Sequence, residues 1–195
     1  MKRICLAVAL LALAGCQTQQ QSVLPPPAEP SVAVPQQQTS QPSVPSAGPL
    51  SKAAVETYMD AQESDLRSYL RGQGVLVARR GDDLVVTISN DRLFDKMEVT
   101  AWGNALITSV AQVLAHFDHS AVVVEGYTDS TGSDSENLAL SEKRARIVAD
   151  ALAKNGVAPS RLTANGFGAT NPKVTDPRDP RNRRIELKIT PTPSG

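Results

Sequence analysis

The sequence carries no net charge, few residues suited to metal binding, and no apolar run that would cross a bilayer as a helix. Lysine and arginine together number 20, and so do aspartate and glutamate. Nucleic-acid binding through a basic overall field is therefore not expected. Only two histidines are present, His116 and His119, without a third ligand at a suitable spacing, so no metal site is predicted. The apolar run at residues 4–13 has about half the length that a membrane-spanning helix needs.

The first sixteen residues have the layout of a secretory signal peptide. Lys2 and Arg3 give a positive start, an apolar run follows, and small residues lead to Cys16. Residues 13–16, Leu-Ala-Gly-Cys, match the bacterial lipobox. This match implies a signal peptide at residues 1–15, a lipid on the Cys16 sulfur, and an acylated new amino terminus, with palmitate among the acyl chains. The alternative is an ordinary signal peptide cut next to the same small residues.

Lipidation at Cys16 would determine where the protein is located and would leave the mature chain without a disulfide. Two or more acyl chains hold a protein stably on a membrane, whereas one chain binds marginally. In lipoprotein sorting an aspartate after the lipidated cysteine retains the protein in the inner membrane, so Gln17 indicates the outer membrane. Cys5 leaves with the signal peptide. The mature chain then has no thiol for a disulfide and must rely on its core.

Residues 17–50 form a low-complexity segment, mostly of Gln, Pro, Ser, Thr, Ala and Val. The segment holds eight prolines, one charged residue, Glu29, and no hydrophobic periodicity. Such a composition does not bury enough apolar surface to offset the entropy of ordering. Together with the lipidated cysteine it is predicted to form a tether at residues 16–50. At roughly 3.1 Å per residue in polyproline II, the tether reaches at most about 100 Å.

The character of the chain changes at Ser51, which is a suitable helix cap. Residues 51–74 are predicted to form an N-terminal helix, which covers residues 52–71 and ends at two glycines. Its apolar face holds Val55, Met59, Leu66 and Leu70. Two apolar runs, at 75–78 and 84–88, then flank turn-forming residues and predict a β-hairpin.

Residues 75–195 are predicted to form one α/β domain, an α+β sandwich in which helices pack on one mixed sheet. Helical spacing of apolar residues predicts helices at 100–117 and 134–154, and apolar runs predict strands at 121–126, 162–167 and 185–190. Counted from the second strand of the hairpin, the order is β-α-β-α-β-β. In the second of these helices the residues expected to face inward are Leu138, Ala145, Val148 and Leu152.

A candidate binding site lies between the strand at 121–126 and the helix that follows it. Thr128 and Asp129 come directly after the strand, where ligands of α/β sheets tend to collect. Asn137 and Arg144 are two helical turns apart and share a face. A carboxylate and a guanidinium converging on one pocket suit a zwitterion, because the first accepts from an ammonium and the second binds a carboxylate. The alternative is a simple salt bridge between Asp129 and Arg144.

Several spaced motifs carry a family resemblance. They are Leu-Phe-Asp-Lys at 93–96, Gly-Tyr-Thr-Asp-Ser-Thr-Gly at 126–132, Asn-Leu-Ala-Leu-Ser-Glu-Lys-Arg-Ala at 137–145, Gly-Phe-Gly at 166–168 and Asn-Arg-Arg at 182–184. In order and spacing they resemble the OmpA C-terminal family, which includes the peptidoglycan-associated lipoprotein Pal and the stator protein MotB. The resemblance covers about residues 75–189. Upstream, residues 58–74 resemble the outer-membrane lipoprotein branch typified by YiaD.

The resemblance implies an OmpA-like domain that binds peptidoglycan non-covalently through meso-diaminopimelate of the stem peptide, with no cofactor and no catalysis. By position, Asp129 would take the diaminopimelate ammonium and Arg144 its carboxylate. The other implied contacts are hydrogen bonds from Asn137 and Thr128, closure by Phe94 and Asp95, an apolar wall at Leu140, and a brace from Arg183 or Arg184. The protein would thus tether the outer membrane to the cell wall. The sequence Lys-Met-Glu-Val at 96–99 replaces small residues of the family, so a changed pocket lip is expected.

The acidic residues of this region leave other functions to weigh. Asp129, Asp134 and Glu136 lie in a Ser- and Gly-containing turn, but they lack the alternating positions of an EF-hand, so calcium is not predicted. Glu125 with Asp129 or Asp134 would offer a carboxylate pair to a wall-cleaving enzyme, yet nothing else resembles a nucleophile with its base. Docking to an envelope protein or a secretion system is a further alternative, and it is compatible with wall binding.

Overall fold

The structure is a computed structural model that describes residues 51–192, so the predicted signal peptide, Cys16 and the tether lie outside the described residues. The elements in chain order are α1 (Lys52–Tyr69), β1 (Leu76–Arg80), β2 (Asp83–Ser89), α2 (Asn90–Leu93), β3 (Phe94–Asp95), β4 (Glu98–Val99), α3 (Ala101–His116), β5 (Ser120–Tyr127), α4 (Asp134–Lys154), η1 (Pro159–Arg161), β6 (Leu162–Gly166), η2 (Pro180–Asn182) and β7 (Arg184–Pro191). Within residues 51–192 no helix is both long and apolar enough to span a bilayer.

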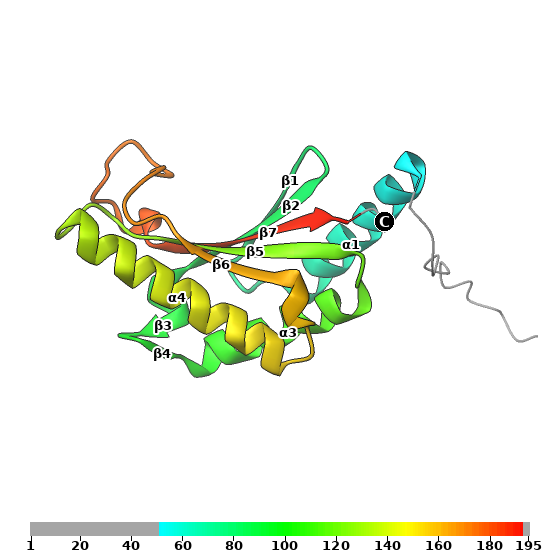
Figure 1. The fold of residues 1–195 in the computed structure, drawn as a ribbon, viewed down its shortest axis with the longest axis horizontal. Coiled ribbons are helices and arrows are strands. Elements are labelled where there is room, and N and C mark those ends of the chain that lie inside the picture. The colour runs from blue at the N-terminus through cyan, green and yellow to red at the C-terminus, as the bar shows by residue number, and fades with distance from the viewer. Residues whose placement is uncertain (1–50, 193–195) are drawn as a thin grey trace, which may run out of the picture. The chain divides into compact units, whose positions relative to one another are not determined.

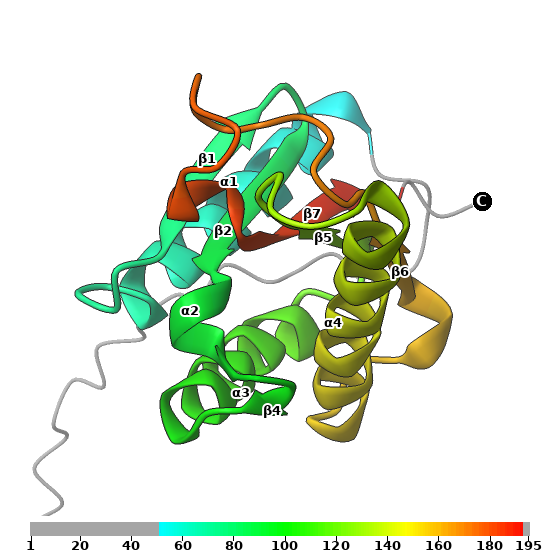
Figure 2. The same ribbon diagram turned by 90° about the vertical axis from the view of Figure 1, so that its left-hand side faces the viewer.

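Five strands form one mixed sheet in the order β1-β2-β7-β5-β6. β5 and β6 are parallel, and the other neighbouring pairs are antiparallel. Both views show α3 and α4 on the same side of this sheet (Figures 1 and 2). The predicted fold class, helices packed on one mixed sheet, is therefore confirmed, as is the predicted order of the long helices and sheet strands.

Helix α1 is part of the same core as the sheet. Its Met59 and Leu66 are fully buried in one hydrophobic cluster with residues of β2, β7 and α3. On the same helix, Asp60 accepts a hydrogen bond from Arg79 of β1 at 2.7 Å. The N-terminal helix therefore folds onto the domain and does not stand apart from it.

Alternation along β7 separates an apolar from a polar face of the sheet. Ile185, Leu187 and Ile189 enter the core, whereas Arg184 and Glu186, which alternate with them along the strand, point the other way. Arg184 donates to Glu186 at 2.7 Å and lies 3.8 Å above the Tyr127 ring. The polar face thus holds a buried ion pair, while the helices cover the apolar face.

Two details differ from the sequence prediction. Leu138 was expected to face inward, but its side chain is 51% exposed because the buried stripe of α4 runs through Asn137, Ser141 and Ala145, one position away. The prediction also missed α2 and the short β3–β4 hairpin between β2 and α3. These elements are two to four residues long, too short to give a hydrophobic period.

Two glycines allow α4 to lie directly on the backbones of β5 and β6. Gly126 and Gly166 are register partners in the parallel pair. A Cβ atom at Gly126 would lie 2.2 Å from the Ser141 carbonyl oxygen, and one at Gly166 would lie 2.4 Å from the Glu142 nitrogen. A glycine inside a strand marks such a close backbone approach. The contact fixes the height of α4 above the sheet.

Replacing Gly126 by alanine tests this contact. The added methyl group would force helix and strand apart, and we expect a loss of about 2–3 kcal/mol in the free energy of unfolding, measured with urea. Gly72→Ala is the control, because no atom lies within 4 Å of its Cβ position and only its positive φ of 74° is unfavourable. That control should cost about 1 kcal/mol. Equal losses in the two variants would contradict the steric explanation.

Candidate functional site

The candidate site lies where β5 ends and α4 begins, as the sequence predicted. Thr128 donates its backbone N–H to the Gly168 oxygen at 2.8 Å, and the Asn137 side chain donates to the Thr131 oxygen at 3.0 Å. A capping box between Ser133 and Glu136 starts the helix. The loop after β5 is therefore held by bonds to both of its neighbouring segments.

Asp129 is paired with Arg183 and not with Arg144. Arg183 Nη1 donates to Asp129 Oδ2 at 2.6 Å, and Thr131 N donates to the other carboxylate oxygen at 3.0 Å. Burial raises the pKa of Asp129, but these hydrogen bonds outweigh it and hold the pKa of this carboxyl below its usual range. The alternative of a structural salt bridge between Asp129 and Arg144 is wrong.

Asp91, which the sequence analysis did not single out, completes a cluster around Arg183. Its Oδ1 accepts from Arg183 Nε at 2.9 Å, and its Oδ2 accepts from Arg183 Nη2. These hydrogen bonds from Asp91 and Asp129 raise the pKa of Arg183. Asp91 and Arg183 are 92 residues apart in the chain, so only the fold brings them together.

Arg144 is the cation of the site that has no carboxylate partner. It is half-buried, its guanidinium lies 5.7 Å from the centre of the Phe94 ring, and its buried Nε has no hydrogen-bond acceptor. Among the salt bridges of residues 51–192, none includes Arg144. Burial lowers the pKa of Arg144, while the charges of Asp91 and Asp129 raise it. An arginine nevertheless stays protonated at any physiological pH.

Two further buried polar atoms near this cluster lack partners. Thr128 is 4% exposed and its hydroxyl makes no hydrogen bond; Asn90 is 2% exposed and its Oδ1 accepts none. Asn90 donates its side-chain N–H to the Tyr127 oxygen at 3.1 Å, so it lies beside the strand end that carries Thr128. Asn90 was missed because an asparagine at the start of a short helix is a common turn residue. Buried polar atoms without partners are rare in proteins and mark this region as unusual.

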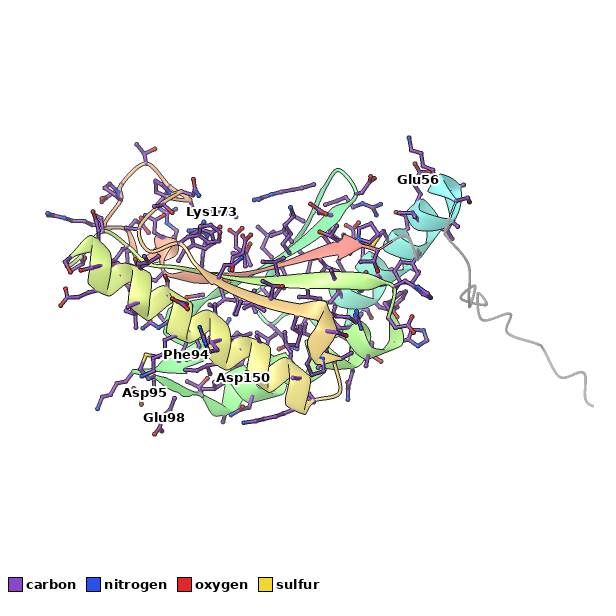
Figure 3. All side chains as sticks on the ribbon, in the orientation of Figure 1. Glu56, Phe94, Asp95, Glu98, Asp150 and Lys173 are labelled. Carbon is purple, nitrogen blue, oxygen red and sulfur yellow. The ribbon has the colours of Figure 1, made fainter. Side chains whose placement is uncertain are left out.

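Of the remaining predicted residues, some lie at the site and one lies on the other face of the sheet. Figure 3 shows Phe94 and Asp95 on the β3–β4 hairpin, below the N-terminal half of α4. Phe94 is buried, Asp95 is exposed and Leu140 is half-buried on the turn before Arg144. Arg184, one of the two predicted braces, instead lies on the polar face of the sheet with Glu186. Adjacent strand residues point to opposite faces, so only Arg183 reaches the site.

The four residues that depart from the family pattern form the turn and second strand of this hairpin. Lys96 adopts a positive φ of 55°, which is uncommon for a residue with a side chain, and Val99 pairs with Phe94. These residues therefore lie in a short hairpin, and the changed pocket lip stays a prediction.

The acidic residues considered for calcium binding or wall cleavage have separate partners in the structure. Glu125 accepts a hydrogen bond from the Tyr127 hydroxyl at 2.8 Å, whereas Asp129 is bound by Arg183. Asp134 is exposed at the start of α4. Within residues 51–192, no three His, Cys, Asp or Glu side chains are grouped so that they could hold a metal ion.

Because the pKa of Asp129 is lowered, the free energy of unfolding should depend on pH. The ion pair with Arg183 adds stability above the unfolded-state pKa of about 3.9, and this stability is lost as the pH falls through the lower folded-state value. In urea titrations, wild type should exceed Asp129→Asn in unfolding free energy by a constant amount above about pH 5, and the difference should shrink below about pH 4. In an Arg183→Gln background most of this pH dependence should vanish. A difference independent of pH would contradict the ionic role.

Comparisons with known proteins identify the family of this domain. Residues 93–186 match the model of the OmpA family. The probable lipoprotein YiaD of Escherichia coli (strain K12) is 43% identical over 140 residues, which are 69% of this chain and 64% of YiaD. The peptidoglycan-binding protein ArfA of Mycobacterium tuberculosis is 38% identical over 87 residues, 43% of this chain and 27% of ArfA. This chain thus spans less than two thirds of the length of either relative.

Among solved structures, the cell wall anchor of the T6SS from Pseudomonas aeruginosa is 30% identical, with a TM-score of 0.55. The similarity covers 65% of this chain and 96% of the anchor. The family match begins just before β3 and ends within β7. The domain that contains residues 93–186 is therefore OmpA-like, and the chain belongs to the OmpA family.

Proposed function

We propose that the chain is an envelope lipoprotein that holds the peptidoglycan wall without a covalent bond, by gripping meso-diaminopimelate of the stem peptide. The observation that carries this proposal is the unequal pairing of two charges. Arg144 is a half-buried cation with no carboxylate partner, whereas the buried carboxylate of Asp129 is paired with Arg183. A guanidinium without a carboxylate partner, next to a carboxylate and two unpartnered oxygens, is suited to an amino acid with both a carboxylate and an ammonium.

In the proposed complex the carboxylate of the ligand binds Arg144, whose Nε has no other acceptor. Arginine presents a planar fork that matches a carboxylate with two parallel hydrogen bonds. The ring of Phe94 supports the guanidinium from one side. Arg144 would thus make the strongest contact with the ligand, and no existing salt bridge of Arg144 has to break first.

The ammonium of the ligand lies on the other side of the site. An ammonium has three N–H donors, and the acceptors offered to it are the Asp129 carboxylate and the unpartnered oxygens of Thr128 and Asn90. Asn137 holds the loop that carries these groups, through its bond to Thr131. In this proposal Asp95 and Leu140 form the lip of the pocket.

The relatives support the same ligand class. ArfA is named a peptidoglycan-binding protein, and the Pseudomonas aeruginosa structure is that of a cell wall anchor. The proposed activity is binding and not turnover, since both carboxylates of the site, Asp91 and Asp129, are held by Arg183. Neither relative is named as an enzyme.

The membrane end of the proposal rests on the sequence. Residues 1–15 are removed as a signal peptide, Cys16 receives the lipid in the outer membrane, and residues 16–50 reach from the membrane to the domain. Each wall contact is weak by itself. Lipid and wall attachment act together, because the tether keeps the domain at a high effective concentration near the wall.

Sedimentation with purified sacculi tests the pocket. Arg144→Ala and Asp129→Ala should each weaken wall binding about tenfold or more, because each removes a charge-assisted hydrogen bond to the ligand. Arg146→Ala is the matched control, since Arg146 is exposed on the same helix and pairs with Glu142 at 2.6 Å. Both pocket variants sedimenting like wild type would contradict the assignment. New muropeptides after incubation with wild type would indicate cleavage instead of binding.

Cell fractionation tests the lipid anchor separately. Cys16→Ser removes the sulfur that would carry the lipid, so the protein should move from the membrane to the soluble periplasmic fraction. Cys5→Ser is the control, because this cysteine lies within the apolar run and should not affect fractionation. Continued sedimentation of the Cys16→Ser protein with membranes would count against lipidation.

A further inference from the structure

We propose that Asp91 determines which chemical form of the diaminopimelate end the site accepts, by bringing the net charge of the pocket to zero. The free, zwitterionic end is then preferred over the same end with an acylated amine. This inference rests on the proposed function. It assigns Asp91 a positioning role, since Asp91 acts through Arg183 and does not itself contact the ligand.

The geometry of Arg183 gives Asp91 this role. Asp91 occupies the Nε and Nη2 edge of the guanidinium with two parallel hydrogen bonds, while Nη1 remains for Asp129 at 2.6 Å. A guanidinium held along one edge has a fixed plane, so the donor that reaches Asp129 is fixed as well. Asp91 thereby determines where the Asp129 carboxylate is bound.

A count of charges shows what Asp91 adds. Asp129 balances Arg183, and without Asp91 the positive charge of Arg144 would remain uncompensated. Burial lowers the pKa of Arg144, and the charges of Asp91 and Asp129 oppose this shift. Around Arg144 and Arg183, two carboxylates and two guanidinium groups therefore carry no net charge, and at the lip the exposed Asp95 and its neighbour Lys96 carry opposite charges. Such a pocket suits a ligand group that also has no net charge.

The ligand group exists in three charge forms. With a free amine and a free carboxylate it is a zwitterion of net charge zero. Acylation of the amine, which is how a cross-link to another stem forms, leaves a monoanion, and amidation of the carboxylate leaves a monocation. Loss of the Asp91 charge makes the pocket positive. The monoanion should then gain affinity relative to the zwitterion, and the monocation should lose affinity.

The size of the effect follows from exposure. The side chains of Asp91 and Arg183 are 49% and 31% exposed, so water screens their charges. We therefore expect each affinity ratio to change by about threefold to tenfold, and not by orders of magnitude. Opposite changes for the two modified ligands are the distinguishing mark, because a loosened or partly unfolded pocket would weaken all three in the same direction.

The experiment uses the full-length chain in detergent and calorimetric titration with three forms of the tripeptide L-Ala-γ-D-Glu-meso-diaminopimelate. One form is unmodified, one is acetylated on the side-chain amine and one is amidated on the side-chain carboxylate. Asp91→Asn should raise the acetylated-to-unmodified affinity ratio about threefold to tenfold and lower the amidated-to-unmodified ratio. Asp91→Glu should restore the wild-type ratios. Glu142→Gln removes an equal charge from an arginine pair on α4 and should change neither ratio.

The outcomes separate the two proposals. If wild type binds the unmodified tripeptide and Asp91→Asn leaves both ratios unchanged, the role of Asp91 is wrong while the proposed function stands. The same holds if both ratios move in one direction. If wild type binds none of the three tripeptides, the proposed function is wrong, and the role of Asp91 is wrong with it.

Discussion

The contact between α4 and the backbones of β5 and β6 is the constraint on which the site depends. At Gly126 and Gly166 the strands carry no side chain, and the helix backbone comes closer than a Cβ atom would permit. Ser141 lies at this contact, and its hydroxyl accepts from the Gly168 nitrogen at 2.9 Å. The turn of α4 that lies on the two glycines thus also binds the segment after β6.

This contact determines the position of Arg144, which follows Ser141 by three residues on α4. The helix is held at one height above the sheet, so Arg144 lies over the Phe94 ring and cannot retreat toward solvent with the helix. The loop after β5 is held from the other side by the Thr128 bond to Gly168. Backbone packing therefore positions both Arg144 and the loop that carries Asp129.

Electrostatics then determines which of these charges is available. Arg183 directly precedes β7 and lies between Asp91 and Asp129, so both carboxylates share one guanidinium. Arg144 has no such partner. If each arginine formed a salt bridge with one carboxylate, neither guanidinium would remain without a partner. Here both carboxylates pair with Arg183, so Arg144 remains without a carboxylate partner.

The sequence by itself determined the fold class, the long helices, the sheet strands and the positions of Thr128, Asp129, Asn137 and Arg144, because these follow from periodicity and from spaced motifs. It did not determine the partner of Asp129, the exposure of Leu138, the separation of Arg183 from Arg184, or the roles of Asn90 and Asp91. Those depend on which segments distant in the chain meet in space and on which face each strand residue points to. Local patterns specify elements, whereas only the packed structure decides which charges lie within hydrogen-bonding distance of one another.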